Sequence, residues 1–144
     1  MTLQPASPDF AALVRASFDA QTMMQTFGAR ITSVLPGAVE ITAPILPGSR
    51  QQHGFAHAAL TFAIGDSASG YAALSLVAPA QEVLTAEMKI NLLAAAQGDE
   101  LIARGRVVRP GRRLIVVQSQ VFARTGDSLV EIALMQGTIV PVTV

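Results

Sequence analysis

The sequence predicts an α+β domain in which an antiparallel sheet wraps around one long apolar central helix, with an extra helix at the N-terminus. Three observations predict this class. Helices do not alternate with strands along the chain, which excludes a doubly wound parallel sheet. One long segment is apolar on every side, as expected for a buried helix. Four long β-type segments follow it, separated by turn signals, and predict an antiparallel meander.

Each element is predicted from its own periodicity and its own turn residues. An amphipathic pattern starts near Asp9 and would end at Gly28, and the long apolar segment carries no convincingly polar side. The expected elements are a helix over 10–27, a hairpin of strands 29–35 and 38–43 around Pro36-Gly37, a loop over 44–52, a buried helix over 55–77, a strand through 84–92 that ends before Gly98-Asp99, and strands over 100–109, 112–124 and 128–140.

The first of the four long strands shows a two-residue alternation. Leu84 and Met88 belong to its apolar set, and Thr85 belongs to its polar set. Because successive side chains of a strand point to opposite faces, we expect Thr85 to point away from the central helix.

Length and composition favour one domain, residues 1–144, with more apolar surface than its own core needs. Hydrophobic residues make up 51% of the chain and charged residues only 14%. This balance implies either a lipid-like pocket or a subunit interface. The exposed edges of a single meander also need pairing or cover, so we expect a homodimer, or two such dimers joined as a tetramer.

Charge and cysteine content exclude several functions. Ten basic residues balance ten acidic ones, so no net field favours nucleic acid or an anionic membrane as a partner. The absence of cysteine excludes disulfides, thiolate zinc sites and a cysteine nucleophile. The N-terminal residues carry no export signal, and we expect a cytoplasmic protein. Polar residues interrupt the long apolar segment, which argues against a membrane span.

Asp66 is the only charged residue of the apolar helix. An ionised carboxylate in an apolar setting is costly unless it is paired or hydrogen-bonded. Carboxylates with such perturbed surroundings are frequent in active sites, so we expect Asp66 to be functional. The alternative is a structural carboxylate that reaches a helix cap, an arginine or a neighbouring subunit.

The helix geometry separates Asp66 from the histidine before the helix. Nine residues of helix place His57 and Asp66 on opposite faces and roughly 13 Å apart, so one chain cannot form a His-Asp pair from them. If Asp66 and the helix N-terminus act on one reacting group, two chains of a symmetric dimer must supply them.

The start of the helix offers unpaired backbone N–H groups that stabilise a negatively charged carbonyl oxygen. Ala58 and Ala59 are small enough for a substrate to approach these groups. His57 is either part of the site or a histidine bonded to backbone, and His53 is a weaker candidate.

Several motifs together resemble the hotdog-fold acyl-CoA thioesterases of the phenylacetic-acid-degradation type. The resemblance covers roughly residues 27–140. The motifs are Gly54, His57-Ala58-Ala59, Asp66-Ser67-Ala68, the strand over 85–93, and the segment over 105–112.

The resemblance implies a role for each matching position. Asp66 matches the general base or nucleophile, and Ala58 matches the glycine whose N–H polarises the thioester carbonyl. Gln51 stands where the family has a water-positioning Asn, and Thr85 stands near a Ser that orients the attacking water in some members. Two departures, Ala58-Ala59 for Gly-Gly and Gln51 for Asn, affect substrate preference or activity.

Arg109, Arg112 and Arg113 flank the Pro110-Gly111 turn. Guanidinium groups at such a tip could hold the phosphates of coenzyme A, and the alternative is a solvated turn.

The resulting hypothesis is hydrolysis of an acyl-CoA thioester whose acyl chain lies in an apolar slot along the helix, without a metal or redox cofactor. A second hypothesis is a non-catalytic module that binds acyl-CoA or a small aromatic ligand. The pattern argues against enoyl-CoA hydration, because hydratases of similar fold carry a histidine about five residues after the aspartate, and this sequence has Tyr71 there and no histidine after Asp66.

Overall fold

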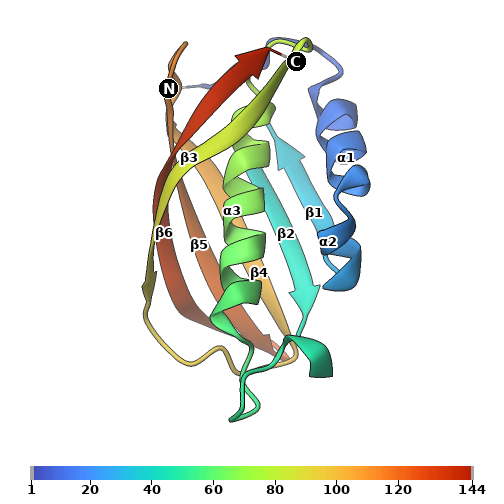
Figure 1. Ribbon diagram of the computed structural model, residues 1–144, viewed down its shortest axis with the longest axis vertical. Coiled ribbons are helices and arrows are strands. Elements are labelled where there is room, and N and C mark those ends of the chain that lie inside the picture. Colours follow the sequence, from blue (N-terminus) through green and yellow to red (C-terminus); the bar gives the residue numbers. More distant parts are fainter. Residues whose placement is uncertain (1, 144) are drawn as a thin grey trace.

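The computed structural model describes residues 2–143 (Figure 1). Its elements are α1 (Phe10–Ala20), α2 (Thr22–Thr26), β1 (Arg30–Leu35), β2 (Ala38–Pro44), the short 3-10 helix η1 (Pro47–Ser49), α3 (Ala58–Leu74), β3 (Gln81–Leu92), β4 (Glu100–Arg109), β5 (Ile115–Thr125) and β6 (Ser128–Thr143).

The six strands form one antiparallel sheet that curls around α3 (Figure 1). This arrangement confirms the predicted α+β class and the hotdog fold that the resemblance implies. The strand order is β1-β2-β4-β5-β6-β3, so the simple meander was wrong for β3. Strand β3 pairs with β6, and its other edge has no partner within residues 2–143. The connection after Leu92 passes three strands over to β4, which lies between β2 and β5.

The N-terminal amphipathic segment forms two helices, whereas the periodicity predicts one. The break lies at Gln21, whose backbone is extended with φ −83° and ψ 93°. The helical spacing predicts one apolar face made of Leu13, Val14, Phe18 and Met24; the last three are buried, but Leu13 is 41% exposed. The periodicity therefore identifies the buried face, but it does not reveal the change of direction between the helices.

Helix α3 fills the space inside the curled sheet, and glycine lets it approach closely. A Cβ at Gly105 of β4 would lie 2.3 Å from the carbonyl carbon of Ala68, so only glycine fits beneath the helix there. The helix is shorter than predicted at both ends, since His57 caps its start and Ser75 ends it.

One face of α3 is not covered by the described residues 2–143. Ala59, Phe62, Asp66 and Gly70 recur at helical spacing, and none of them is buried; Phe62 is 38% exposed. The prediction that this helix is buried nearly all round was therefore wrong for a single chain. Within residues 2–143, no helix is both long and apolar enough to span a membrane.

A β-bulge in β3 reverses the direction of its side chains. Thr85 pairs with Ile139 and Glu87 with the adjacent Thr138, so Ala86 is an extra residue without a partner. Before the bulge, Val83 packs towards the core and Leu84 is 61% exposed. After the bulge, Met88 packs towards the core. The predicted single apolar face of this strand was therefore wrong.

Candidate active site on the central helix

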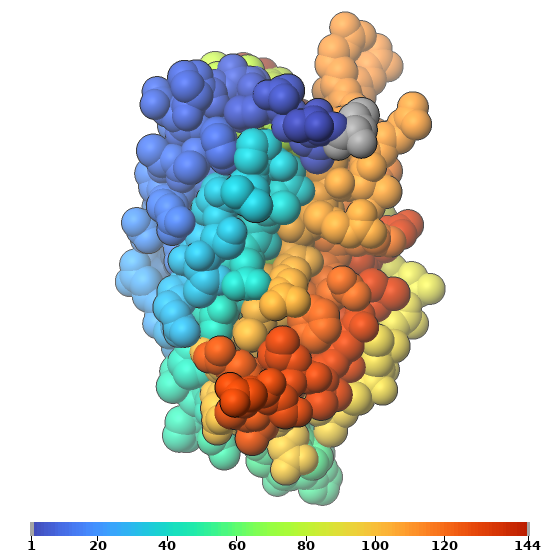
Figure 2. All heavy atoms as spheres, turned by 180° about the vertical axis from the view of Figure 1, so that it is seen from behind, coloured from blue at the N-terminus to red at the C-terminus, as the bar shows by residue number. Residues whose placement is uncertain are grey.

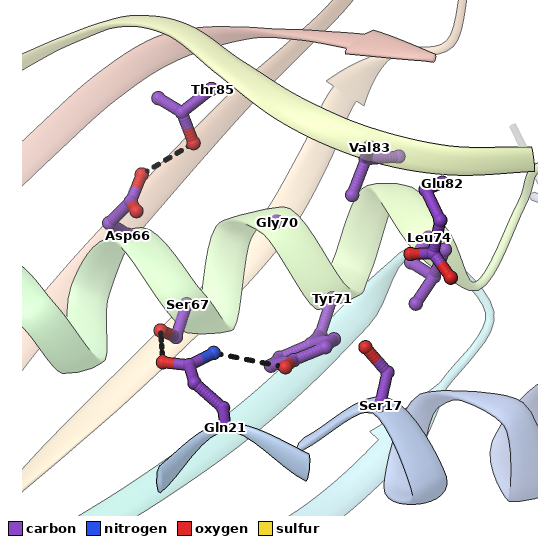
Figure 3. Close-up of a pocket in the computed structure, with 10 residues that line it drawn as sticks. All are labelled: Ser17, Gln21, Asp66, Ser67, Gly70, Tyr71, Leu74, Glu82, Val83 and Thr85. Atoms are coloured by element: carbon purple, nitrogen blue, oxygen red, sulfur yellow. Dashed lines mark hydrogen bonds between the residues drawn. The ribbon is translucent and has the colours of Figure 1, made fainter. Parts of the chain in front are cut away.

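Asp66 and Thr85 face each other across the space between α3 and β3. The Thr85 hydroxyl donates a hydrogen bond to Asp66 Oδ1 at 2.8 Å (Figure 3). The expectation that Thr85 points away from the helix was wrong, because the bulge at Ala86 changes the phase of the strand. Two of the residues that the sequence selected are thus brought into contact.

The surroundings of Asp66 shift its acid–base equilibrium. Burial raises the pKa of the Asp66 carboxyl above its ordinary value, because desolvation disfavours the ionised form. The hydrogen bond from Thr85 lowers the pKa and offsets part of that rise. Asp66 is therefore a carboxyl whose proton affinity is increased and whose orientation is fixed by one donor.

A pocket of about 150 Å³ opens beside Asp66, between α1, α3 and β3 (Figure 3). Leu74 and Val83 contribute apolar surface. The polar residues that line it are Ser17, Gln21, Ser67, Tyr71, Glu82 and Thr85. The apolar setting expected for Asp66 was therefore wrong, since the helix supplies polar neighbours on this face and α1 and β3 add more.

His57 caps the start of α3. Its Nδ1 accepts a hydrogen bond from the Ala59 N–H at 2.9 Å. This is the backbone-bonded state that the sequence leaves open for this histidine. The Ala59 N–H is consequently occupied. The N–H of Ala58 donates to no acceptor within residues 2–143, and it remains the available donor of the first turn.

The turn before α3 places Gln51 beside Ala58. Gln51 N–H donates to the Phe55 carbonyl at 2.8 Å, and Gly54 N–H donates to the Gln51 carbonyl at 3.0 Å. Gly54 adopts φ +87°, a conformation that favours glycine. The Gln51 side-chain oxygen accepts from the His53 N–H. A second cavity, of about 280 Å³, is lined by both Gln51 and Ala58.

The two halves of the candidate site lie apart within one chain. Asp66 and Ala58 line different pockets, and eight residues of helix separate them by about 12 Å along the axis. His57 and Asp66 bond to different partners, in accordance with the predicted absence of a His-Asp pair.

The arginine-bearing loop lies at the other end of the molecule from Ala58. The Val107 N–H bonds to Gly37, whose own N–H bonds to the Ser75 hydroxyl just after α3. Arg109, Arg112 and Arg113 are exposed, and the loop protrudes from the molecule (Figure 2). The structure therefore brings these arginines near neither Asp66 nor Ala58 of the same chain.

Sequence reasoning missed the contribution of α1 to the pocket. Gln21 Nε2 donates to the Tyr71 hydroxyl at 3.0 Å, and the Ser67 hydroxyl donates to Gln21 Oε1 at 3.3 Å. Ser67 and Tyr71 lie one and five residues after Asp66, and neither spacing places two side chains on the same helix face, so no sequence signal linked them to Asp66. Nothing in the periodicity around Gln21 indicates that its side chain would leave the helical face and reach α3.

Comparison with known proteins identifies the family. The Thioesterase superfamily profile matches residues 53–130, more than half of the chain. A thioesterase family protein from Silicibacter pomeroyi is 41% identical, with a TM-score of 0.92 over 94% of this chain and 99% of that one. The chain therefore belongs to the thioesterase superfamily.

More distant structures share the fold. The PaaI protein from the phenylacetic acid degradation operon of E. coli is 20% identical, with a TM-score of 0.84 over 95% of this chain and 96% of that one. A Bacillus halodurans protein, determined with CoA, is 20% identical, with a TM-score of 0.76 over 93% of this chain and 86% of that one. No curated protein matches the sequence.

Proposed function

We propose that the protein hydrolyses acyl-CoA thioesters with Asp66 as general base or nucleophile. The observation that carries this proposal is the Asp66 carboxyl, which is partly desolvated and held by Thr85 at the wall of a pocket. Membership of the thioesterase superfamily supports the same reaction. A carboxylate with increased proton affinity accepts a proton from water more readily than an ordinary aspartate does.

The reaction proceeds by addition to the thioester carbonyl. In the general-base route, Asp66 takes a proton from water as the water oxygen attacks the carbonyl carbon. In the nucleophilic route, the carboxylate attacks first and water then cleaves the anhydride. The carbon–sulfur bond breaks, and the thiolate of CoA leaves and takes up a proton.

The Ala58 N–H stabilises the negative charge on the carbonyl oxygen in this proposal. This N–H makes no hydrogen bond with the described residues, and it lies at the start of a helix, where the helix dipole also favours negative charge. Because Asp66 of the same chain lies about 12 Å away along the helix, the carboxylate facing Ala58 comes from the partner subunit. A symmetric dimer then holds two equivalent sites.

Two uncovered surfaces favour a homodimer built on β3. The outer edge of β3 has no neighbouring strand within residues 2–143, and Leu84 and Leu92 on it are 61% and 59% exposed. The uncovered face of α3 carries the exposed Phe62. An open strand edge with apolar side chains is stabilised by pairing with a second copy. Further pairing of dimers into a tetramer stays a prediction.

Antiparallel pairing of two β3 strands also accounts for the arginines. It inverts one subunit relative to the other, so Arg109, Arg112 and Arg113 lie at the same end as the partner's helix N-terminus. Their guanidinium groups then bind the phosphates of CoA while the thioester reaches Ala58. The CoA in the Bacillus halodurans structure is consistent with such a ligand on this fold.

Within the superfamily, we assign the chain to the phenylacetic-acid-degradation type, on the motifs at His57-Ala58-Ala59 and Asp66-Ser67-Ala68. The single domain over 1–144 and the cytoplasmic location remain predictions.

A thiol-release assay tests the function. Purified protein is incubated with short-, medium- and long-chain and phenylacetyl CoA esters, and free CoA is measured with a disulfide reagent, for which the cysteine-free chain gives no background. We expect turnover that falls at least about 100-fold in Asp66→Asn. The matched control is Asp19→Asn, an exposed aspartate on α1. Saturable binding without turnover across the panel would instead support the non-catalytic binding module.

A further inference from the structure

Gly70 forms part of the wall of the pocket beside Asp66, and packing does not explain why it is glycine. It lies four residues after Asp66 and therefore on the same face of α3. A Cβ at this position would meet no atom within 4 Å, and its backbone is helical. By contrast, a Cβ at Gly65 of the same helix would lie 2.3 Å from Met135 Sδ.

Glycine inside a helix is less favourable than alanine, because its backbone loses more conformational freedom on folding. At Gly65 the close packing of the sheet accounts for this cost, but at Gly70 no neighbour within residues 2–143 does. The absent side chain at Gly70 instead leaves space next to the Asp66 carboxyl. An acyl group placed next to the Asp66 carboxyl would lie over Gly70, which lines the same pocket.

The wall of the pocket opposite β3 is a polar cluster contributed by α3 and by Gln21 at the break between α1 and α2. Tyr71 is 7% exposed, and its hydroxyl accepts from Gln21 Nε2 at 3.0 Å. The Ser67 hydroxyl donates to the side-chain oxygen Oε1 of Gln21 at 3.3 Å (Figure 3). The Tyr71 O–H has no acceptor within residues 2–143 and is free to donate to a ligand oxygen.

A buried hydroxyl without an acceptor loses a hydrogen bond that it makes in water. A ligand oxygen beside Tyr71 would restore that bond, whereas a plain alkyl group would leave the hydroxyl unpaired. Charge also discriminates in this pocket, because Glu82 lines it and disfavours a carboxylate on the acyl group of the ligand.

We propose that Gly70, Tyr71 and Gln21 determine acyl selectivity and favour short acyl groups that carry a neutral hydroxyl oxygen over alkyl groups of equal length. This inference rests on the proposed thioesterase activity. Gly70 sets the space available beside the reacting carbonyl. Tyr71, held in place by Gln21, recognises the hydroxyl.

The test compares CoA esters of matched size. The values of kcat/KM are measured for butyryl-CoA, 3-hydroxybutyryl-CoA, 4-hydroxybutyryl-CoA and succinyl-CoA. We expect at least one hydroxy ester to exceed butyryl-CoA by about fivefold or more, the effect of roughly one hydrogen bond. We expect succinyl-CoA to be the slowest of the four.

Variants assign the effect to the named residues. Tyr71→Phe keeps the ring that packs edge-on against Phe18, with centroids 6.0 Å apart, and is expected to bring the ratio of hydroxy ester to butyryl-CoA to about one. Thr138→Val is the matched control, because Thr138 bonds to Glu87 outside the pocket, and it should keep the ratio. Gly70→Val should reduce turnover of the four-carbon esters more than that of acetyl-CoA.

The outcomes separate the two proposals. Turnover that requires Asp66, with equal kcat/KM for butyryl and both hydroxybutyryl esters, would overturn the selectivity and leave the thioesterase function intact. A ratio that survives Tyr71→Phe would overturn the role of Tyr71. No turnover of any ester would overturn the proposed function and this inference with it.

Discussion

The Thr85 hydroxyl on β3 donates a hydrogen bond of 2.8 Å to Asp66 Oδ1 on α3. This single bond joins the edge strand of the sheet to the only charged residue of the central helix. It is a donor that stabilises the ionised carboxylate and so opposes the effect of burial on the Asp66 pKa. Burial, which raises the Asp66 pKa, and this bond, which lowers it, together set the pH at which Asp66 is a base.

Removal of the Thr85 hydroxyl is expected to shift activity towards higher pH. Thr85→Val keeps the shape of the side chain but removes the donor, so the pKa of Asp66 rises further. The acidic limb of the kcat/KM–pH profile should shift to higher pH, and kcat/KM at the acidic end should fall by up to about fivefold. Thr85→Ser retains a hydroxyl and should follow the original profile. An unchanged limb in Thr85→Val would contradict this role.

Asp66 should cost folding stability at neutral pH. Below the ordinary aspartate pKa, the carboxyl is neutral in both the folded and the unfolded chain. As pH rises, the unfolded chain ionises first, because burial raises the folded-state pKa, so stability falls until pH exceeds that folded-state value.

The stability of Asp66→Asn checks this sign. Asn accepts the Thr85 hydrogen bond without carrying a charge, so we expect the variant to melt at a higher temperature than the parent at neutral pH. The difference should vanish at about pH 3, below the ordinary aspartate pKa. Calorimetry across pH measures it, and a parent protein that is the more stable of the two at neutral pH would rule out this account.

The fold was largely predictable because its elements are long and separated by clear turn residues. The apolar helix and the turns at Gly37 and Gly126 were enough to predict the α+β class and the order of the elements along the chain. The bulge at Ala86 was not predictable, because the alternation of apolar and polar residues continues through it without a break. The bulge nevertheless turns the side chains that follow it to the opposite face of the sheet. The pairing of β3 with β6 is equally invisible to periodicity, because it depends on a long connection.

Arg112 should act on binding and not on the chemical step. If its guanidinium group holds a CoA phosphate, Arg112→Ala should raise KM roughly 5- to 10-fold and scarcely change kcat. Arg15→Ala, an exposed arginine on α1, is the control. Steady-state kinetics with one ester distinguishes the two parameters. A change confined to kcat would argue against phosphate binding.

Leu84 should be needed for subunit pairing. It is 61% exposed on the open edge strand, where a charged side chain opposes pairing. Leu84→Lys is expected to give monomers in sedimentation analysis and to lose most turnover, at least about 10-fold, because each site needs both chains. Leu35→Lys on β1, at the opposite edge, is the control. A dimer that survives in Leu84→Lys would remove β3 from the interface.

The site was predictable as separate positions but not as a pocket. Asp66 stands out as a lone charge in an apolar helix, and Ala58 follows from the helix start. Gln21 and Tyr71 do not stand out, because their contact depends on the break after α1 and on the packing of two helices distant in sequence.

The central claim is that Asp66 and the Ala58 N–H of one site come from different subunits, and two inactive variants test it together. Asp66→Asn removes the base. Ala58→Pro removes the N–H at the first helical position, where proline is tolerated, and His57 already has the extended φ −65° and ψ 144° that proline requires before it.

The decisive measurement is thioesterase activity of the two variants co-expressed in equal amounts. Each variant alone should be nearly inactive. Random pairing makes half of the dimers mixed, each with one intact site, so the mixture should recover about a quarter of the parent activity. If both groups of a site came from one chain, no mixed dimer would hold an intact site, and a mixture as inactive as its components would contradict the account.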